Sequence, residues 1–567
     1  MKKNILSVAF LILAFNVSFL NAQTIDPTVE VSRDFDVKMM EIRKPDLPTD
    51  VADSLQRFDI SFDYSIFNRP YLDLYEFSPY QSAQLKEITP RKNPFVYARI
   101  GTQYPLLPSA ELYLQAVSKG GFYASLYGRH NSFWGNVPSA QNDYEVASDR
   151  MKNIVGGNMK YAWNTGEVLF DANYNYDRYK FDYGVRSADH DNRELNLSMN
   201  LNSAYRDDDS IYYRLGVLYR HSEKYLTMQD TLPIVDTIGG GQLKENLLKV
   251  TGSVGTTFDV HRVYIDMDIE YASYSGTKDH TAGIVEFSPI YEYKKGKFFG
   301  KIGVKFGSIY GINTEDNTQE DDQPRDHESI SSNIFPDVDA RLELSPKTLW
   351  LHAVVGGGNE LNAFSSLTNL CPLIGPKSQL NFASRPLDAK FSFETVIRSR
   401  IAFNAYSSFT VYRNKMIFTP VISGGEPYSI VPEYFNVNKL TFGLETFWKS
   451  KDVTTGGEFK YNRYSSPDSL STTNLPKFTG HVYLRYNWRE RIVAQVDCNY
   501  TSSVSGDKYG VYSVPAIWDL DVHVNFVLSK NLAVFCKGGN LLNKRNQYIP
   551  LYVEPGINFG GGICVNF

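Results

Sequence analysis

From about Pro94 to its end, the chain is a succession of segments in which apolar and polar residues alternate. In the segment WDLDVHVNF, Trp518, Phe526 and every second residue between them are apolar. The places between them hold Asp519, Asp521, His523 and Asn525. Because successive side chains of a β-strand point to opposite sides, such a segment is predicted to be a strand with one apolar and one polar face. The chain contains about 22 such segments, at a spacing typical of strands of about ten residues joined by turns.

The connections between these segments alternate between short and long. The short ones are SKGG at Ser118, NTGE at Asn164, RDDDS at Arg206, DVHR at Asp259, KKGK at Lys294, SPKT at Ser345, SKDV at Ser450, RERI at Arg489 and SKN at Ser529. Long connections are expected around residues 131–150, 222–241, 313–329, 359–386 and 415–433. A sheet in a soluble core has no reason to make every second connection long, whereas an outer-membrane barrel has short periplasmic turns and long external loops. We therefore predict an all-β fold, a transmembrane antiparallel outer-membrane β-barrel of about 22 strands whose apolar faces meet lipid.

The end of the chain predicts its orientation in the membrane. The last alternating run, FGGGICVNF, ends on Phe567, and an aromatic last residue is typical of a barrel strand that reaches the periplasmic side. The connection before this run, around Lys544 to Pro555, is long and is therefore expected to be external. With an even number of strands, both ends of the chain are expected in the periplasm of a Gram-negative bacterium.

The region before the barrel divides into two parts. Lys2 and Lys3 precede an apolar stretch, and small residues follow up to Ala22, so residues 1–22 are predicted to be a signal peptide. Residues 23–92 are polar and rich in proline, and are expected to form a periplasmic or lumen-entering segment. The barrel is expected over residues 93–567.

Composition excludes several classes of protein. After residue 22 there is no run of about 18 apolar residues, which argues against a bundle of membrane helices. The net charge of −5 argues against a nucleic-acid-binding protein, which would carry a concentrated basic surface. The cysteines are too scattered for a disulfide framework or a zinc site, and free thiols are expected at Cys371, Cys498, Cys536 and Cys564.

The C-terminal half resembles the barrel of TonB-dependent outer-membrane receptors, particularly those of Bacteroidetes-type bacteria. The motifs that carry the resemblance are GGNLLNKRNQYIPLYVEPGINFGGGICVNF from Gly538, YFNVNKLTFGLE from Tyr434, PKFTGHVYLRYNW from Pro476 and IFPDVDARLEL from Ile334. The resemblance covers roughly residues 330–567. It implies a barrel of 22 strands, uptake of a nutrient, a surface lipoprotein or envelope protein as partner, and an energy-coupling protein.

Two features depart from the pattern of that family. Ile557 stands where the family usually has arginine. Family members also carry a plug domain of well above one hundred residues before the barrel, whereas about 70 residues precede it here. The segment TVEVSRDF at Thr28 is the one candidate for binding the energy-coupling protein. Transport by a barrel with a reduced plug therefore stands beside an alternative, in which a plugless barrel is a scaffold or partner in an outer-membrane assembly or secretion complex.

The candidate ligand-binding residues are polar side chains of alternating segments, expected on the lumen face. They are Asp519, Asp521, His523, Asp266, Asp268, Glu270, Arg214 and Arg485. Tyr212, Tyr264 and Tyr483, together with Arg220, would bind sugars or peptides by stacking and hydrogen bonds, or would fill space near the wall. The acidic stretch from Glu315 to Glu328 is either a solvated external loop or a calcium-binding one, although it lacks the spacing of a twelve-residue calcium loop.

An enzymatic function is not expected. An Asp–His dyad at Asp521 and His523 would activate water, but the same spacing arises in any strand with a polar lumen face. The sequence contains neither a G-x-S-x-G nucleophile motif nor a phosphate-binding glycine-rich loop followed by a helix. We therefore expect no catalytic residues, no cofactor and no resident metal, with the outer-membrane lipids as surroundings.

Overall fold

The computed structural model describes residues 95–567, apart from the connecting segments 141–144, 183–185, 204–210, 231–240, 278, 312–330, 424–425, 467–474, 506–512 and 550–551. Within these residues the chain is all β except for one short helix. The expected signal peptide, the expected segment 23–92 and the acidic stretch 315–328 lie outside the described residues. No helix among the described residues is both long and apolar enough to cross a membrane.

The strands follow one another along the chain with short or long connections. The first twelve are β1 (Val96–Tyr104), β2 (Ser109–Lys119), β3 (Phe122–Pro138), β4 (Glu145–Trp163), β5 (Gly166–Asp182), β6 (Arg186–Ser203), β7 (Ile211–Asp230), β8 (Gly241–Phe258), β9 (His261–Gly276), β10 (His280–Lys295), β11 (Phe298–Gly311) and β12 (Ser331–Ser345). The rest are β13 (Leu349–Leu361), β14 (Phe382–Ile397), β15 (Ile401–Ser423), β16 (Glu426–Lys449), β17 (Val453–Ser465), β18 (Phe478–Trp488), β19 (Ile492–Thr501), β20 (Val504–Ser505), β21 (Ser513–Val514), β22 (Ile517–Val527), β23 (Leu532–Gly539) and β24 (Asn558–Asn566). Helix α3 (Phe364–Leu370) lies between β13 and β14.

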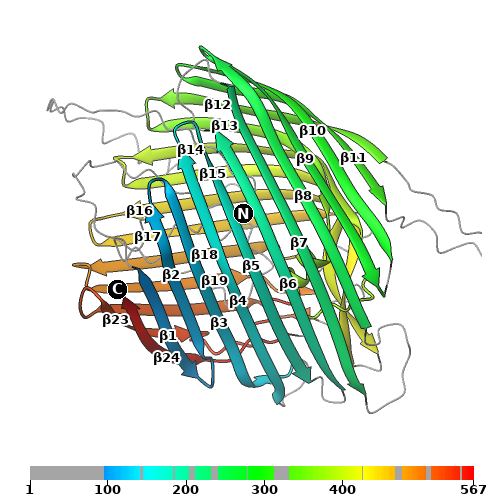
Figure 1. The fold of residues 1–567 in the computed structure, drawn as a ribbon, viewed down its shortest axis with the longest axis vertical. Coiled ribbons are helices and arrows are strands. Elements are labelled where there is room, and N and C mark those ends of the chain that lie inside the picture. The colour runs from blue at the N-terminus through cyan, green and yellow to red at the C-terminus, as the bar shows by residue number, and fades with distance from the viewer. Residues whose placement is uncertain are drawn as a thin grey trace, which may run out of the picture. The chain divides into compact units, whose positions relative to one another are not determined.

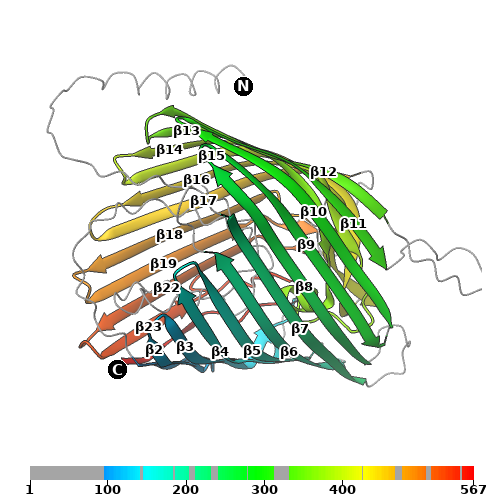
Figure 2. The same ribbon diagram turned by 45° about the horizontal axis from the view of Figure 1, so that its top comes forward.

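Twenty-two of these strands form one closed antiparallel barrel. Each strand pairs with the next one along the chain, β19 pairs with β22, and β20 and β21 form a separate two-stranded sheet. The barrel closes because β1 also pairs with β24, with Ile100 opposite Ile563. Figures 1 and 2 show the tilted strands running around this barrel. The predicted fold class and the predicted number of strands are therefore confirmed.

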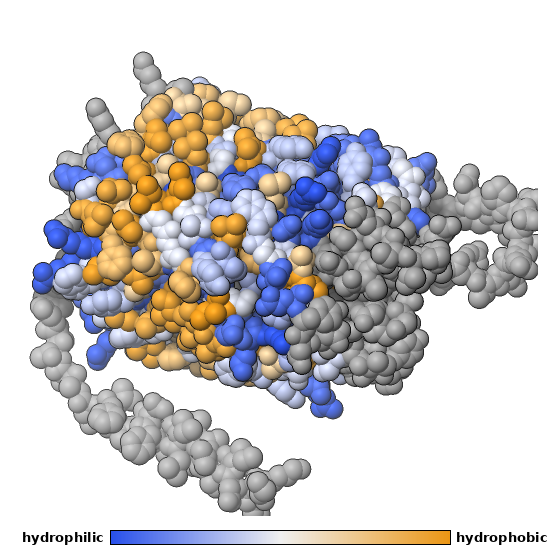
Figure 3. Space-filling model, turned by 90° about the horizontal axis from the view of Figure 1, so that it is seen from below, coloured by the Kyte–Doolittle hydropathy of each residue, from blue (hydrophilic) through white to orange (hydrophobic). Residues whose placement is uncertain are grey.

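The two faces of the strands differ in exposure and chemistry as the alternation requires. In β22 the side chains of Trp518 and Phe526 are 45% and 38% exposed, whereas those of Asp519 and His523 are 5% and 4% exposed. Figure 3 shows the outward apolar side chains as an orange belt with hydrophilic surface on both sides of it. An apolar band between two polar rims is the surface that a bilayer requires of a barrel.

One end of the barrel, which we call the turn end, carries the short connections and Phe567. The other end, called the loop end, carries the long connections, among them residues 362–381 and 540–557. Every short connection predicted from the sequence lies at the turn end, except that RDDDS falls outside the described residues. The turn at residues 398–400 was missed, because no break in composition marks the sequence RSR.

The expected bounds of three long connections were wrong. The described residues of the ranges 131–150, 222–241 and 415–433 are mostly strand, and β15 extends to Ser423 while β16 begins at Glu426. In this part of the wall the outward face also becomes polar, as at the exposed or half-buried His221 and Glu223 of β7. A strand that is polar on both faces loses its alternation, and its sequence then looks like that of a loop.

Candidate functional site: the closure at the loop end

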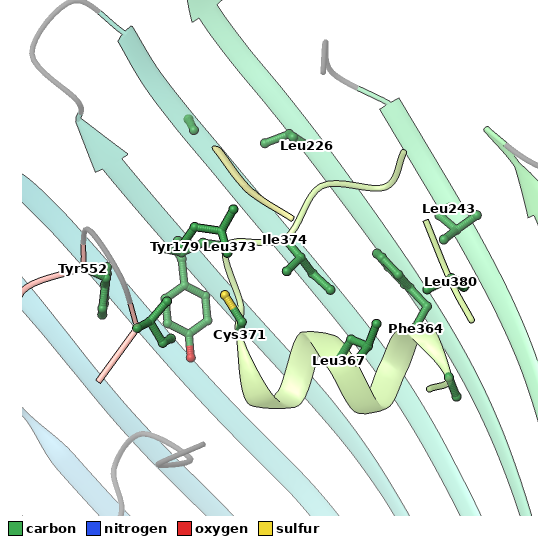
Figure 4. Packing of buried hydrophobic residues seen from close by; sticks show 14 of the residues in the cluster. Tyr179, Leu226, Leu243, Phe364, Leu367, Cys371, Leu373, Ile374, Leu380 and Tyr552 are labelled. Carbon is green, nitrogen blue, oxygen red and sulfur yellow. The ribbon is translucent and has the colours of Figure 1, made fainter. Parts of the chain in front are cut away.

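Two connections of the loop end fold into the barrel, and we call them together the closure. They are residues 362–381, which contain α3, and residues 540–557. Phe364, Leu367 and Ile374 of the first connection are almost completely buried, and they belong to a cluster that includes Tyr552 of the second. Figure 4 shows α3 with Phe364, Leu367 and Cys371 facing neighbouring strands of the wall. The barrel thus has an apolar core of its own at this end.

The wall supplies the N-terminal cap of α3. The residue before the helix, Ala363, makes no capping bond through its side chain. Instead, the backbone N–H of Phe364 donates to Oε2 of Glu245 at 2.6 Å, and that of Ser365 donates to Oε1 of Glu245 at 3.2 Å. Glu245 is on β8 and is fully buried. A carboxylate that accepts two of the free N–H groups fixes where the helix begins and holds it against the wall.

Three further side chains of the wall bind the same connection. Nζ of Lys224 on β7 donates to the carbonyl oxygen of Pro372 at 2.6 Å. Nη1 of Arg220, also on β7, donates to Oγ of Ser365 at 3.2 Å. On the β6 side, Nδ2 of Asn369 donates to Oε2 of Glu194 at 3.3 Å. Polar anchors therefore hold the connection at the start of α3, in its last turn and just beyond its end.

The second connection is held by Arg150 of β4. Its Nη1 atom donates to Oε2 of Glu554 at 2.9 Å, and its Nη2 atom donates to the carbonyl oxygen of Val553 at 3.2 Å. The guanidinium carbon also lies 4.1 Å from the ring centroid of Tyr552. Arg150 is 2% exposed, so this charged contact is enclosed by protein. Removing one partner of such an ion pair leaves the other charge buried and without compensation.

The hairpin of β15 and β16 adds a third contact. Ile430 of β16 forms an isolated backbone bridge with Ile374 of the first connection. Both side chains are buried, at 1% and 0% exposed. The hairpin therefore pins the first connection from the side opposite β7.

The wall beside these anchors contains buried polar side-chain atoms that form no hydrogen bond with the part of the closure that the structure describes. Five buried wall residues of β4 to β7 each have a side-chain atom with no hydrogen-bond partner among the described residues: Ser148, Asp177, His190, Asn192 and Ser222. The register sets Asp177 opposite Asn192, and Asn192 opposite Lys224. Buried polar groups without partners are uncommon in a permanent core, so this face of the wall is suited to contact with water or polar solutes.

Comparison with known proteins bears on the fold. No family model matches the sequence, and no curated protein matches it. Among solved structures, the FrpB iron transporter from Neisseria meningitidis matches with a TM-score of 0.63 and 10% identity, over 84% of this chain and 82% of its own. The copper transporter OprC matches with a TM-score of 0.62 and 11% identity, over 84% of this chain and 82% of its own. BauA, the ferric preacinetobactin receptor from Acinetobacter baumannii, matches with a TM-score of 0.60 and 11% identity, over 84% of this chain and 80% of its own.

The chain has the fold of TonB-dependent outer-membrane transporter barrels. At about 10% identity the likeness is one of fold. The match covers 84% of the chain, a larger part than the resemblance noted from sequence motifs.

Within this barrel, the candidate residues fall into two separate groups. On β7 and β9, Arg214 and Asp266 both stand opposite Ser253, while Lys249 pairs with Asp268 at 3.4 Å and with Glu270 at 3.2 Å. On β18 to β22, Arg485 stands opposite Gln495, which stands opposite His523. Whether either group binds a ligand stays a prediction.

Two of the candidate carboxylates bind the closure. Oδ2 of Asp519 accepts a hydrogen bond from the hydroxyl of Tyr548 at 2.7 Å, and Oδ1 of Asp521 accepts one from the backbone N–H of Asn540 at 3.0 Å. His523, two residues further, has its Nε2 atom 3.2 Å from Nη2 of Arg99. The arrangement therefore ties β22 to the second connection.

The candidate tyrosines lie against the wall. A Cβ atom at Gly456 would approach the ring of Tyr483 to 2.7 Å, so this glycine leaves room for the ring to lie on the neighbouring strand. The hydroxyl of Tyr264 donates to Oε1 of Glu292 at 2.5 Å, and Tyr212 packs edge-on against Tyr264 with centroids 6.0 Å apart. These contacts favour the space-filling interpretation of the tyrosines over a sugar-binding one.

The sequence also led us to expect no resident metal and four free thiols. The described residues contain no group of three or more His, Cys, Asp or Glu side chains that could hold a metal ion. All four cysteines are free. Burial raises the pKa of the Cys371 thiol in the closure to about 12, which keeps it protonated at neutral pH.

Sequence reasoning missed the anchors of the closure, namely Arg150, Glu194, Lys224 and Glu245. Each is a single charged side chain whose neighbours on the same face range from polar residues to the buried Leu243 and Leu247 beside Glu245, so nothing in the local pattern distinguishes an inward charge from a solvated one. The one available signal was the apolar content of the long connection itself, FSSLTNLCPLI, which is unusual for an external loop.

Proposed function

We propose that this protein carries a bulky nutrient across the outer membrane, and that the closure is the gate of the passage. The observation that carries the proposal is the mismatch at the closure. Its connections are held by a few polar anchors, whereas the wall beside the anchors has buried polar atoms without partners. The buried polar atoms of such a wall form most hydrogen bonds when the closure moves and water or a polar solute takes its place.

The known structures support transport as the activity. The descriptions of FrpB and OprC name them as transporters of iron and copper, and that of BauA names a receptor for ferric preacinetobactin. Passage of a solute across the outer membrane is the role that this chain would share with them.

The orientation and the partners belong to the same proposal. Both termini would be periplasmic, with the turn end inside and the closure facing the exterior. Residues 23–92 would then reach the lumen from the turn end and serve in place of a full plug. A surface lipoprotein would deliver the nutrient to the closure, and an energy-coupling protein would act on the N-terminal segment. A tag within residues 316–326 should be labelled on intact cells, and a tag at Lys451 only after the outer membrane is opened.

A reversible disulfide tests whether the closure must move. In a variant with the four natural cysteines replaced by serine, Ile374→Cys and Ile430→Cys would join the first connection to the β15–β16 hairpin. Bridged backbone segments lie about 4.8 Å apart, which is within the span of a disulfide. The matched control is Ser308→Cys with Ser332→Cys, since these hydroxyls on β11 and β12 are 2.8 Å apart on the exposed surface of the wall.

The readout is the set of solutes that cells with the protein remove from a rich medium and cells without it do not, measured by mass spectrometry. The oxidised Ile374–Ile430 variant should lose this uptake and regain it on reduction, while the control keeps it in both states. Uptake that persists in the oxidised variant would refute the gate. If no solute depends on the protein, and envelope-assembly proteins co-purify with it in fixed ratio, the scaffold alternative would replace transport.

A further inference from the structure

Half of the turn end carries a strong excess of exposed basic residues. Six consecutive connections, from the one between β10 and β11 to the one between β22 and β23, occupy together with the strand ends beside them residues 294–297, 345–348, 398–400, 449–452, 489–491 and 528–531. Their exposed basic residues, which we call the basic rim, are Lys294, Lys295, Lys297, Lys347, Arg398, Arg400, Lys449, Lys451, Arg489, Arg491 and Lys530. Their exposed acidic residues are Asp452 and Glu490.

The basic rim is local and does not follow from the composition of the chain. With the strand ends beside them, the other four short connections contain, in sequence, Lys119, Arg206 and Arg262 against Glu167, Asp207, Asp208, Asp209 and Asp259. The whole chain has a net charge of −5. Cations are therefore concentrated along one half of one edge, in a protein that is otherwise acidic.

The basic rim lies at the depth of an aromatic girdle. Phe298, Trp448 and Trp488 are 42%, 41% and 43% exposed on the outward face, and each is next in sequence to a basic residue. The guanidinium carbon of Arg489 lies 5.5 Å from the ring centroid of Trp488. Exposed aromatic rings of this kind sit at the level of the lipid headgroups. The cations beside them are consequently at the level of the phosphates.

We propose that the basic rim binds the phosphate groups of anionic phospholipids in the leaflet that surrounds the turn end. The rim places at least one cation on every connection along the edge of the barrel, which matches a planar row of headgroups better than the compact footprint of a protein. Neighbouring carboxylates are too few to neutralise it. Juxtamembrane lysine and arginine residues attract anionic lipids individually, and several of them act together.

Quenching of single tryptophans by brominated lipids tests this proposal. One variant retains only Trp488, within the basic rim, and a second retains only Trp163, at the β4–β5 connection of the other half. The purified barrels are placed in mixtures of phosphatidylcholine and phosphatidylglycerol in which one lipid or the other is brominated. Trp488 should show a preference for phosphatidylglycerol on the order of fivefold, which weakens in high salt, and Trp163 should show little preference.

Charge removal identifies the groups responsible. In the barrel that retains Trp488, replacing Lys449, Lys451, Arg489 and Arg491 with glutamine should reduce the preference to about one. The control Lys160→Gln removes a cation from the other half, where Lys160 pairs with Glu167 at 2.8 Å, and should leave the preference unchanged. Heat-modifiable mobility on gels checks that every variant is folded.

Several results would overturn the proposal. Equal quenching of Trp488 by both brominated lipids would exclude anionic lipid, and would make an acidic protein the better candidate for the basic rim. An equal preference at Trp163 would show that the effect is not local. Loss of the preference in inorganic phosphate, but not in chloride of the same ionic strength, would indicate a site for free phosphate instead of a lipid surface.

Discussion

Arg150 and Glu554 are 404 positions apart in the chain, yet Nη1 of the first lies 2.9 Å from Oε2 of the second inside the barrel. Arg150 is on β4, near the start of the wall, and Glu554 is in the connection between the last two barrel strands. This ion pair connects the last long connection, on the lumen side of the wall, to β4, a strand that pairs with neither β23 nor β24. The closure is thus part of the tertiary structure and not a loose external loop.

Removing this cation should loosen the closure. Arg150→Met leaves the partly buried Glu554 without its partner, at a cost of about 3–5 kcal/mol where the pair is fully enclosed. Cells that carry this variant should become more sensitive to large antibiotics such as vancomycin. The control Arg178→Met breaks an outward, exposed pair with Asp189, which contributes about 0–1 kcal/mol, and should change nothing. Equal sensitivity of the two variants would mean that the pair does not hold the lumen closed.

Cys371 provides a direct reporter of closure movement. Its thiol is buried and its pKa is raised to about 12, so little thiolate exists at neutral pH and alkylation should be slow. Glu245→Gln weakens the cap on the N–H groups of Phe364 and Ser365, and should expose the thiol more often. We expect alkylation of Cys371, followed by mass spectrometry, to become about tenfold faster in this variant, as a local destabilisation of about 1.4 kcal/mol would give. An unchanged rate would show that α3 does not depend on the wall for its position.

The fold was predictable from sequence because the bilayer imposes a simple rule on each strand. Trp518 and Asp519 differ in chemistry, and their exposure differs accordingly. The closure was not predictable, because it depends on contacts such as Lys224 with the carbonyl of Pro372, which are far apart in sequence and have no periodicity. The same polar residue types line an open lumen and anchor an inward connection, so only the three-dimensional register distinguishes the two roles.

The wall also contains sites where a glycine is required by a neighbouring ring. A Cβ atom at Gly443 would lie 2.1 Å from Cζ of Tyr406, whereas one at Gly356 would meet nothing within 4 Å. Gly443→Ala should therefore destabilise the barrel by about 1–3 kcal/mol, because Tyr406 has to move from the wall. Gly356→Ala should be close to neutral. Urea titrations of the refolded barrels in detergent, followed by heat-modifiable mobility, would measure the difference. Equal midpoints would contradict this role of the glycine.

The two faces of β22 can be compared at adjacent positions. Val522→Arg places a cation on the face of the exposed apolar side chains, and such a substitution costs about 2–4 kcal/mol at the middle of a bilayer. His523→Arg places it on the opposite face, beside Asn525. The first variant should give less folded protein in the outer membrane than the second, as measured by heat-modifiable bands. Equal yields would refute the assignment of the faces.

The segment before the barrel is the candidate for closing the turn end. The backbone N–H of Phe95 donates to the carbonyl oxygen of Phe567, so this segment joins the barrel at the turn end, whereas the closure lies at the loop end. Deleting Asp26 to Leu85, which lie outside the described residues, should leave an inserted barrel because all 22 paired strands of the barrel lie after residue 95.

If this segment acts in place of a plug, the deletion should raise permeability to large antibiotics or remove a bound partner protein. Its combination with Arg150→Met should raise permeability further than either change alone, since the two changes open opposite ends of one lumen. Antibiotic sensitivity and co-purified protein would be measured in all four strains. If the deletion changes neither quantity, even in the Arg150→Met background, the segment is only a tether, and a transport model that relies on it as a plug has to be abandoned.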